Sequence, residues 1–574
     1  MTPEPDARAA KRPFSPYLKT SLLALPLLFF LLFYFYPLAA ILRLSFAPAG
    51  TADWSALRRL ISTPTYLHTL WFTTWQAAVS TLLVLLLALP AAYVFARYRF
   101  RGRDSLRTLS TLPFVLPTVV VAAAFGALLG PNGLLNVWLM RWLDLPAPPI
   151  RLNQTVWMIL LAHVFYNFSV ALRIISGYWQ NLGDELPQAA QLLGASPRRA
   201  FWTITLPLLR PAIVGAAVLV FIFCFTSFGV VLILGGPRFA TLEVEIYRQA
   251  VNLFNLPLAA ALSLLQILFT FVLMAFYTRT QARMARPLAL RAARTTARPL
   301  RTWQDRLFVG AVLGGMLLLL ALPLLALLLR SFSGPDGPTL RFYQELFVNR
   351  RGSALFVPPA TAVFNSTAFA LATTLLATTL GLLATHTIHN SQSPINHSQF
   401  TIHNLPFSSL LDPLFMLPLA TSAVTLGFGY IVALNRPPLN LRSSIALVPI
   451  AHTLVAMPFV IRAVLPAVRR IRPSLREAAA VLGANPMQVW RQVDWPLIRR
   501  AVLVGAVFAF TVSLGEFGAT VFIARPQTPT LPIAIYRFLG QPGALNVGQA
   551  MAMSSLLMGV CAAGFVAIER FRVG

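Results

Sequence analysis

Residues 188–197 read QAAQLLGASP, and residues 477–486, which lie 289 positions later, read EAAAVLGANP. Both segments place two alanines, a glycine and a proline at the same spacing. The agreement extends to a second proline in each segment, Pro207 and Pro496. A chance match between apolar segments would share leucine and alanine, so the shared glycine and proline positions indicate an internal repeat.

The same shift of 289 residues aligns the two halves of the chain without a gap over about 90 positions. The matches are not confined to abundant apolar residue types. They include His163 with His452, Arg173 with Arg462, Phe228-Gly229 with Phe517-Gly518, and Ile246-Tyr247-Arg248 with Ile535-Tyr536-Arg537. We therefore interpret the chain as a duplication of one unit.

The composition excludes an ordinary water-soluble enzyme. Of the 574 residues, 57% are hydrophobic and only 11% are charged, and the mean hydropathy is +0.70. Soluble domains carry about 25% charged residues. The net charge of +29 comes almost entirely from arginines in short loops between apolar segments, which disfavours a nucleic-acid-binding surface. Only Cys224 and Cys561 are present, both in apolar segments, so neither a disulfide framework nor a zinc site is expected.

A helix that crosses a bilayer needs about 20 mostly apolar residues, because roughly 30 Å of hydrocarbon is covered at 1.5 Å per residue. Six such segments are predicted in each half. They begin near Ser21, Leu70, Thr108, Thr155, Ile213 and Leu256, and near Leu307, Ala362, Leu410, Ser443, Ala501 and Val547. The expected fold is thus an all-α integral membrane protein with about 12 transmembrane helices in two parallel six-helix repeats.

The positions of the arginines predict the orientation. The loops Arg97–Arg107, Thr278–Arg306 and Leu465–Arg500 hold five, eight and seven arginines. Placing these loops in the cytoplasm puts both termini there, including the polar tail of residues 1–20. The first half is assigned to residues 21–277 (core about 68–277), the linker to 278–306 and the second half to 307–574 (core about 360–568). Each half has an even number of crossings, so both face the same way, and a pathway is expected between them.

The quoted motif lies in the loop after the fourth predicted crossing of each half. Gly194 and Gly483 can end a helix in a left-handed conformation. Ser196 and Asn485 each precede a proline, an order typical of an N-cap followed by the first helical residue. The pattern predicts two short helices joined at a sharp bend and lying parallel to the membrane, a shape that suits a groove on a partner protein.

This spacing resembles the Glu-Ala-Ala loop in the permease subunits of bacterial binding-protein-dependent ABC importers. The double length and the segments Ser513–Thr520 and Thr530–Tyr536 are similar to ferric-iron and thiamine permeases. The resemblance implies a type-1 transmembrane fold in the bacterial inner membrane, an extracytoplasmic solute-binding protein, and two copies of an ATPase subunit. It also implies that the ATPase-coupling loops contain Gln188, Ala189, Ala190, Gly194, Pro207, Glu477, Ala478, Ala479, Gly483 and Pro496. Two residues depart from the family motif: Gln188 replaces its glutamate, and Trp495 replaces its leucine.

The resemblance implies a permease rather than an enzyme, with ferric iron as the favoured solute and thiamine or another small solute as the alternative. A phosphate-binding P-loop needs a lysine after its glycines, and no lysine follows Lys19 in this chain. We therefore expect ATP and Mg²⁺ on the partner ATPase and no cofactor on this chain.

Glu516 is the strongest candidate for a pathway residue, because an ionisable residue within a membrane usually faces a cavity or a partner. It lies at the eleventh predicted crossing, and Ser227 occupies the equivalent position of the first half. The hypothesis is a pathway or gating role for both; a buried structural hydrogen bond is the alternative for Glu516. No catalytic residue or metal ligand is predicted, and the His-containing loop Ile388–Ser408 is interpreted as a tolerated insertion.

Two rival interpretations belong to other classes of protein. A secondary transporter can also be built from six plus six parallel helices, but it would need no ATPase and therefore no repeated docking loop. A polytopic membrane enzyme would need clustered acids, histidines or a nucleophile on one membrane face. The sparse acidic residues do not provide such a cluster.

Overall fold

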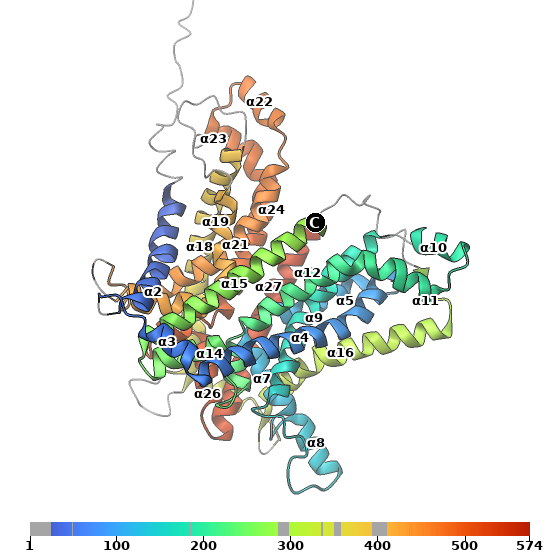
Figure 1. Cartoon of the computed structure of the whole chain (residues 1–574), viewed down its shortest axis with the longest axis horizontal. Coiled ribbons are helices and arrows are strands. Elements are labelled where there is room, and N and C mark those ends of the chain that lie inside the picture. Colours follow the sequence, from blue (N-terminus) through green and yellow to red (C-terminus); the bar gives the residue numbers. More distant parts are fainter. Residues whose placement is uncertain are drawn as a thin grey trace, which may run out of the picture.

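The computed structural model describes residues 24–48, 50–182, 185–284, 298–334, 337–348, 357–392, 410–435, 437 and 439–573. Most of these residues lie in helices (Figure 1). Eleven of the described helices are long and apolar enough to cross a membrane, and a bent pair would make a twelfth crossing. The prediction of an all-α membrane protein with about 12 crossings is confirmed. The tail of residues 1–20, residues 285–297 of the linker and residues 393–408 of the His-containing loop lie outside the described residues.

Each predicted crossing corresponds to one helical span or bent pair of helices, although some begin 10 to 16 residues from the predicted start. In the first half the spans are Ala24–Phe46, which ends with α2 (Tyr36–Phe46), α4 (Pro64–Arg97), Thr118–Trp142, which joins α7 (Thr118–Leu129) to α8 (Leu134–Trp142), α9 (Val156–Asn181), Pro197–Phe225, which ends with α12 (Leu206–Phe225), and α15 (Leu256–Met284). In the second half they are α16 (Trp303–Ser331), α18 (Pro359–Gln392), the bent pair α19 (Leu411–Ala420) and α20 (Ala423–Ala433), α21 (Leu447–Arg469), Pro486–Gly515, which ends with α24 (Trp495–Gly515), and α27 (Ala544–Val573).

Short helices and strands fill the connections. The helices include α3 (Ser55–Ser62), α5 (Arg103–Leu109), α6 (Leu112–Val115), α10 (Glu185–Leu192), α11 (Pro197–Ala200), α13 (Gly229–Leu234), α14 (Leu242–Tyr247), α17 (Arg341–Gln344), α22 (Pro473–Val481), α23 (Pro486–Val489), α25 (Thr520–Ile523) and α26 (Leu531–Leu539). Strand β1 (Tyr98–Arg99) pairs in parallel with β2 (Arg298–Pro299), and β3 (Ser333–Gly334) pairs antiparallel with β4 (Gly337–Pro338). The first pair joins the end of the linker to the first half.

The same three-helix bundle appears in both halves. In the first half α4 packs against α9 and α12, and in the second half α18 packs against α21 and α24. Small residues permit the close approach of these helices. A Cβ atom on Gly381 of α18 would lie 2.8 Å from Cγ1 of Val460, and one on Gly505 of α24 would lie 3.2 Å from the Cα of Val460. The structure thus repeats the arrangement that the sequence register predicts.

The halves are interlocked through their first spans. Helix α2 of the first half packs against α20 of the second, and α16 of the second half packs against α7 of the first. In Figure 1 the blue α2 accordingly stands beside the orange helices, and the yellow-green α16 lies below α4. Gly429 of α20 permits this contact, because a Cβ atom there would lie 3.0 Å from Cβ of Pro37.

The third and ninth crossings are broken rather than continuous. The third begins at Thr118, ten residues after the predicted start, because Pro117 holds Leu116 in an extended conformation with ψ 140°. The ninth is bent by 95° between α19 and α20, just after Pro418. Helices α7 and α20 occupy equivalent places, since α7 packs against α13 and α26 while α20 packs against α25 and α14. The apolar sequence predicts a crossing at each place but does not predict these breaks.

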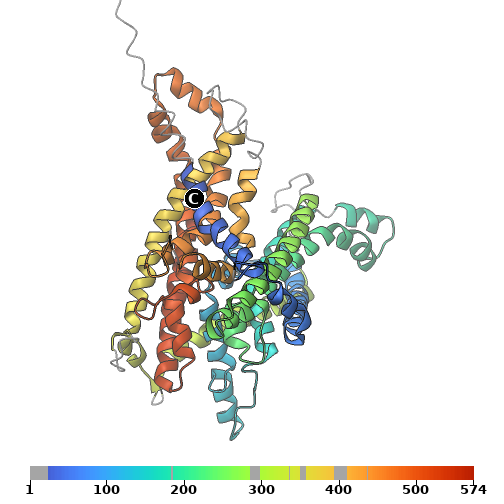
Figure 2. The same ribbon diagram turned by 60° about the vertical axis from the view of Figure 1, so that its left-hand side comes forward.

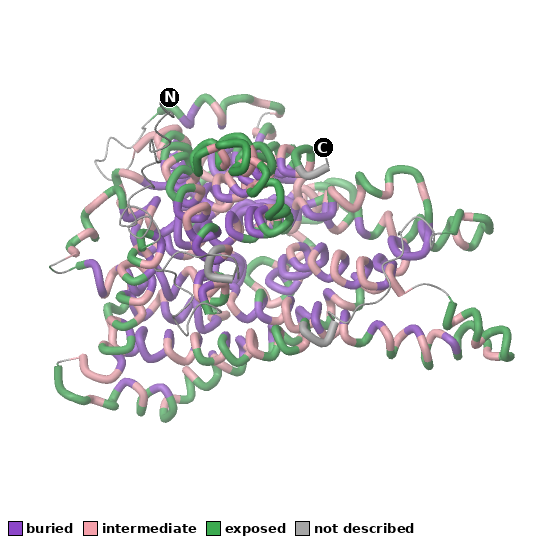
Figure 3. The backbone as a smooth tube through the Cα atoms, turned by 90° about the horizontal axis from the view of Figure 1, so that it is seen from above, coloured by how far each residue is buried: buried purple, intermediate pink, exposed green. Residues whose placement is uncertain are grey.

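Buried residues run through the middle of the molecule and include both halves (Figure 3). Large apolar side chains on the outer helices are exposed, among them Leu82, Leu318 and Phe364. In a membrane protein such an exposed apolar surface faces lipid, which is as apolar as leucine. The buried centre between the halves is therefore the place to look for a pathway.

Candidate functional site

The repeated loops form the predicted bend twice. Helices α10 and α22 end before Gly194 and Gly483, whose φ angles are +91° and +87°. The N–H of Ala195 donates to the carbonyl of Ala190, and the N–H of Ala484 donates to that of Ala479. This is the hydrogen bond of a Schellman helix end, which requires a left-handed residue and therefore favours glycine. The predicted helix ends are confirmed.

The second limb of each loop differs from the prediction. Ser196 Oγ accepts from the N–H of Arg199, and Asn485 Oδ1 accepts from the N–H of Gln488, so both predicted N-caps are present. However, α11 and α23 continue through a π-helical turn into α12 and α24. Each limb is therefore the first turn of the next span and not a separate helix parallel to the membrane. Pro197 and Pro486 are the first residues of α11 and α23, a position at which proline is tolerated.

The coupling residues predicted from the resemblance lie together on these exposed loops. Exposed positions are Gln188, Ala189, Gly194, Pro207, Glu477, Ala478, Gly483 and Pro496, while Ala190 and Ala479 are half-buried. Sequence reasoning missed the most exposed apolar side chains: Leu192 and Leu193 are each 89% exposed, and Val481 and Leu482 are each 87% exposed. These four residues, here called the apolar tips, occupy equivalent repeat positions. An apolar dipeptide before each motif glycine was the signal that could have identified them.

The two loops lie far apart at separate ends of the molecule, in both Figure 1 and Figure 2. They are also supported differently. In the second loop Arg476 forms an ion pair with Asp494 at 2.7 Å between Nε and Oδ1. The equivalent residues of the first loop are Pro187 and Thr205, which cannot form such a pair.

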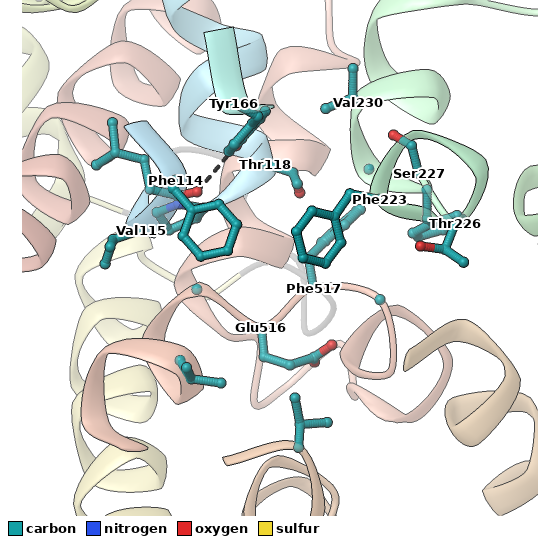
Figure 4. A pocket seen from close by; sticks show the side chains of 18 of the residues that line it. Phe114, Val115, Thr118, Tyr166, Phe223, Thr226, Ser227, Val230, Glu516 and Phe517 are labelled. Atoms are coloured by element: carbon teal, nitrogen blue, oxygen red, sulfur yellow. Dashed lines mark hydrogen bonds between the residues drawn. The ribbon is translucent and has the colours of Figure 1, made fainter. Parts of the chain in front are cut away.

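A central cavity of about 370 Å³ lies between the two halves (Figure 4). The ends of α12 and α24 and the segment before α7 form its walls. Phe114 and Val115 lie across it from Thr226 and Ser227, while Glu516 lies below Phe517. The two predicted pathway residues, Glu516 and Ser227, therefore line one cavity.

The carboxylate of Glu516 also has a structural role. Its Oε1 accepts from the N–H of Ala519 at 2.8 Å, and its Oε2 accepts from the N–H of Thr520 at 3.0 Å and from the Thr520 hydroxyl. These bonds hold the carboxylate at the N-terminus of α25, where negative charge is favoured. Glu516 is thus both a buried hydrogen-bonded residue and a wall of the cavity.

Two buried histidines support the equivalent walls. His163 lies between Ser80 and Ser227, at 3.0 Å and 2.8 Å from the two hydroxyl oxygens. His452 lies between Ser513 and Thr520, at 2.8 Å from each hydroxyl oxygen, and its Nε2 is 3.4 Å from Oε2 of Glu516. Each ring is thus held between two hydroxyl groups. Within the described ranges no three His, Cys, Asp or Glu residues are grouped as a metal site would require.

Comparison with known proteins supports one family. Residues 84–286 match the family model described as "Binding-protein-dependent transport system inner membrane component". The chain is 28% identical over 502 residues to the thiamine transport system permease protein ThiP of Brucella abortus (strain 2308), covering 87% of this chain and 86% of that protein. It is 28% identical to the ThiP of Salmonella typhimurium, with 91% of each chain covered, and 25% identical to a probable ABC transporter permease of Sinorhizobium fredii, with 94% and 93% covered.

A solved bacterial ABC transporter involved in the import of alginate is 19% identical, with a TM-score of 0.39, and covers 47% of this chain and 96% of that one. The relatives span nearly the whole chain, and they match the double length that the internal repeat produces. Residues 84–286 match the family of inner membrane components of binding-protein-dependent transport systems, and the chain, which its relatives match over most of its length, is a fused, double-length permease subunit of an ABC importer.

Proposed function

We propose that this permease imports thiamine or a closely related organic cation delivered by an extracytoplasmic binding protein. The observation that carries the substrate assignment is the set of full-length relatives named as thiamine permeases. Ferric iron, which the overall resemblance favours, receives no specific support from these relatives. We also propose that the chain lies in a bacterial inner membrane with both termini and both coupling loops in the cytoplasm.

The chemistry of the central cavity supports an organic cation over a metal ion. Its wall contains the exposed rings of Phe114 and Phe223 and one carboxylate, that of Glu516. Aromatic rings attract organic cations through their faces, whereas a hard metal cation needs several oxygen ligands. Cavities of about 300–1,000 Å³ are typical of sites for small organic molecules, and this one has a volume of about 370 Å³.

Two ATPase subunits, which would carry ATP and Mg²⁺, are proposed to dock on the two coupling loops. The apolar tips support this partner, because four large apolar side chains exposed at 87–89% favour burial against another protein. Their repeat in equivalent positions suits two copies of one subunit rather than two different partners.

The first experiment is a pull-down of the tagged chain from mild detergent, with partners identified by mass spectrometry. We expect an ATPase subunit with the parent chain and none with the variant Gly194→Asp/Gly483→Asp. Cells that carry the chain, the ATPase and the binding protein should then take up labelled thiamine but not labelled ferric iron.

The rival interpretations predict different results. Uptake that persists after ATP depletion and collapses when the ion gradient is dissipated would indicate a secondary transporter. Iron uptake without thiamine uptake would overturn the substrate assignment while leaving the importer mechanism intact.

A further inference from the structure

An aromatic stack joins the two halves at the centre of the molecule. Phe228 and Phe517 occupy equivalent repeat positions, and their rings stack with centroids 5.7 Å apart at an interplanar angle of 25°. One ring comes from each half, so the stack lies where the pseudo-two-fold axis passes between the halves. Both side chains are buried.

A second equivalent pair of rings flanks the stack. The ring centroid of Tyr247 lies 5.6 Å from that of Phe228, and that of Tyr536 lies 5.4 Å from that of Phe517, with the ring planes inclined by 63° in both pairs. Tyr247 also contacts Phe522 of the opposite half at 5.5 Å. The five rings, here called the aromatic cluster, therefore cross between the halves at two contacts.

The aromatic cluster lies at one end of the central cavity. Helices α12 and α24 both run from the coupling loops toward this cluster, and Phe228 and Phe517 follow their last residues. The cavity residues Phe223, Thr511 and Val512 come earlier in the same helices, nearer the loops. Phe228 and Phe517 themselves line the cavity, so their rings form its wall on the side away from the coupling loops.

Glycines beside the rings permit this close contact. A Cβ atom on Gly229 would lie 2.3 Å from Oγ1 of Thr118 and 3.2 Å from Cδ1 of Phe517. A side chain at residue 229 would therefore clash with Thr118 of the same half and crowd the ring of Phe517 in the opposite half. The contact between the two phenylalanine rings contains no hydrogen bond and can be broken by rotation of one half against the other, a motion expected of paired repeats.

We propose that the stack of Phe228 and Phe517, flanked by Tyr247 and Tyr536, is the extracytoplasmic gate of the pathway, closed in this structure. The assignment to the extracytoplasmic side rests on the proposed function, which places the coupling loops in the cytoplasm. The separated loops (Figure 2) agree with a state in which the cavity is shut from outside. Approach of the loops would separate the ends of α12 and α24 and part the rings.

The test measures access from outside to a cysteine in the cavity. In a background of Cys224→Ser and Cys561→Ala, Phe223→Cys is treated in intact cells with a membrane-impermeant maleimide. Serine is suitable at residue 224 because Ser513 occupies the equivalent position. We expect at least tenfold faster labelling when Phe228→Ala and Phe517→Ala are added, and a smaller increase with the volume-conserving Phe228→Leu and Phe517→Leu. The matched control is Phe459→Ala/Phe508→Ala, which removes another stacked pair, at 6.2 Å, from within the second half.

Two outcomes would overturn the proposal: unchanged labelling in the alanine and leucine variants when both insert normally, or equal acceleration in the control. The assay requires neither ATP nor a substrate, so a wrong solute assignment would leave it unaffected. Leu193→Cys, at an apolar tip, reports on orientation separately. Its labelling from outside would contradict the proposed cytoplasmic side of the loops, whereas its protection together with faster labelling of Phe223→Cys would support the gate.

Discussion

The two halves share one scaffold but place different chemistry on it. In the first half His163 meets the hydroxyl of Ser227, and in the second half the equivalent His452 lies 3.4 Å from the carboxylate of Glu516. The bundle around each histidine is the same, while the cavity receives a negative charge from one side only. Duplication therefore supplies a symmetric frame, and substitution at a few buried positions makes the lining of the cavity asymmetric.

The contacts between the halves show the same contrast. Helix α14 packs against α20, and α26 packs against α7 in the equivalent way. At the contact of α14 with α20 the fully buried Glu243 accepts from Ser422 Oγ at 2.6 Å and from Gln266 Nε2 at 3.0 Å. At the equivalent contact of α26 with α7, Pro532 corresponds to Glu243 in the repeat register. Pro117, the N-cap of α7, corresponds to Ser422, the N-cap of α20. The first contact therefore contains a buried polar pair, whereas the two equivalent prolines cannot form a side-chain hydrogen bond.

The largest effect on uptake is expected from a substitution in either coupling loop, and comparing the two loops tests whether they are equivalent. Gly194→Asp and Gly483→Asp should each reduce uptake to background, because both glycines have positive φ angles and the new charge would lie at the docking bend. Uptake and recovery of the ATPase are measured for variants that insert normally. Gly102→Asp is the matched control, since Gly102 also has a positive φ of 78° and open space around it but lies outside the loops. Full uptake by either coupling variant would show that its loop is not a docking site.

The next largest effect is expected at the polar contact of α14 with α20, which joins the two halves. Glu243→Leu should lower the free energy of unfolding by about 1–3 kcal/mol, because the Ser422 hydroxyl and the Gln266 amide lose a buried partner. Glu243→Gln keeps an oxygen for Ser422 and should cost less. Thermal unfolding in one detergent, with Glu245→Gln as a neighbouring control, measures both. Equal stability of Glu243→Leu and the parent chain would mean that the polar contact of α14 with α20 does not stabilise the association of the halves.

The third largest effect is expected when the negative charge of Glu516 is removed from the cavity wall. Glu516→Gln should slow uptake of a cationic solute about tenfold, which corresponds to about 1.4 kcal/mol in the barrier. The amide oxygen can still accept from one of the two N–H groups at the start of α25, so the side chain keeps part of its local hydrogen bonding. Asp412→Asn, a carboxylate that pairs with Arg469 at 3.7 Å outside the cavity, should change uptake little. Equal, mild effects in initial uptake rates would leave Glu516 with only its structural role.

Sequence patterns predicted the features that depend on local chemistry. The crossings followed from apolar length, and the bends at Gly194 and Gly483 followed from the glycine and proline spacing, because both are decided within a few residues. The break between α19 and α20 also has local signals, Pro418 and the N-cap Ser422, but they lie in an apolar run that predicts only a membrane crossing.

Contacts between distant segments could not be predicted in the same way. The first span of each half is apolar on all sides, so its sequence does not specify that α2 packs on α20 and α16 on α7. The match of Phe228 with Phe517 was visible in the repeat register, but their stacking depends on how two whole bundles meet. The hydrogen bonds that Glu516 accepts could not be predicted either. The N–H groups that donate to its carboxylate belong to a turn that the apolar pattern does not define.

The smallest expected effect concerns the support of the second coupling loop. Arg476→Ala removes the ion pair with Asp494, whose side chains are 30% and 17% exposed. Partly exposed pairs contribute about 0.2–1 kcal/mol, so affinity for the ATPase should fall by less than about fivefold. The loss should shrink at high salt, where screening has already weakened the pair. Pro187→Ala, at the equivalent position of the first loop, removes no charge and should show no salt dependence. A larger, salt-independent loss for Arg476→Ala would mean that Arg476 contacts the ATPase directly, so the two loops would differ in their docking chemistry and not only in their internal support.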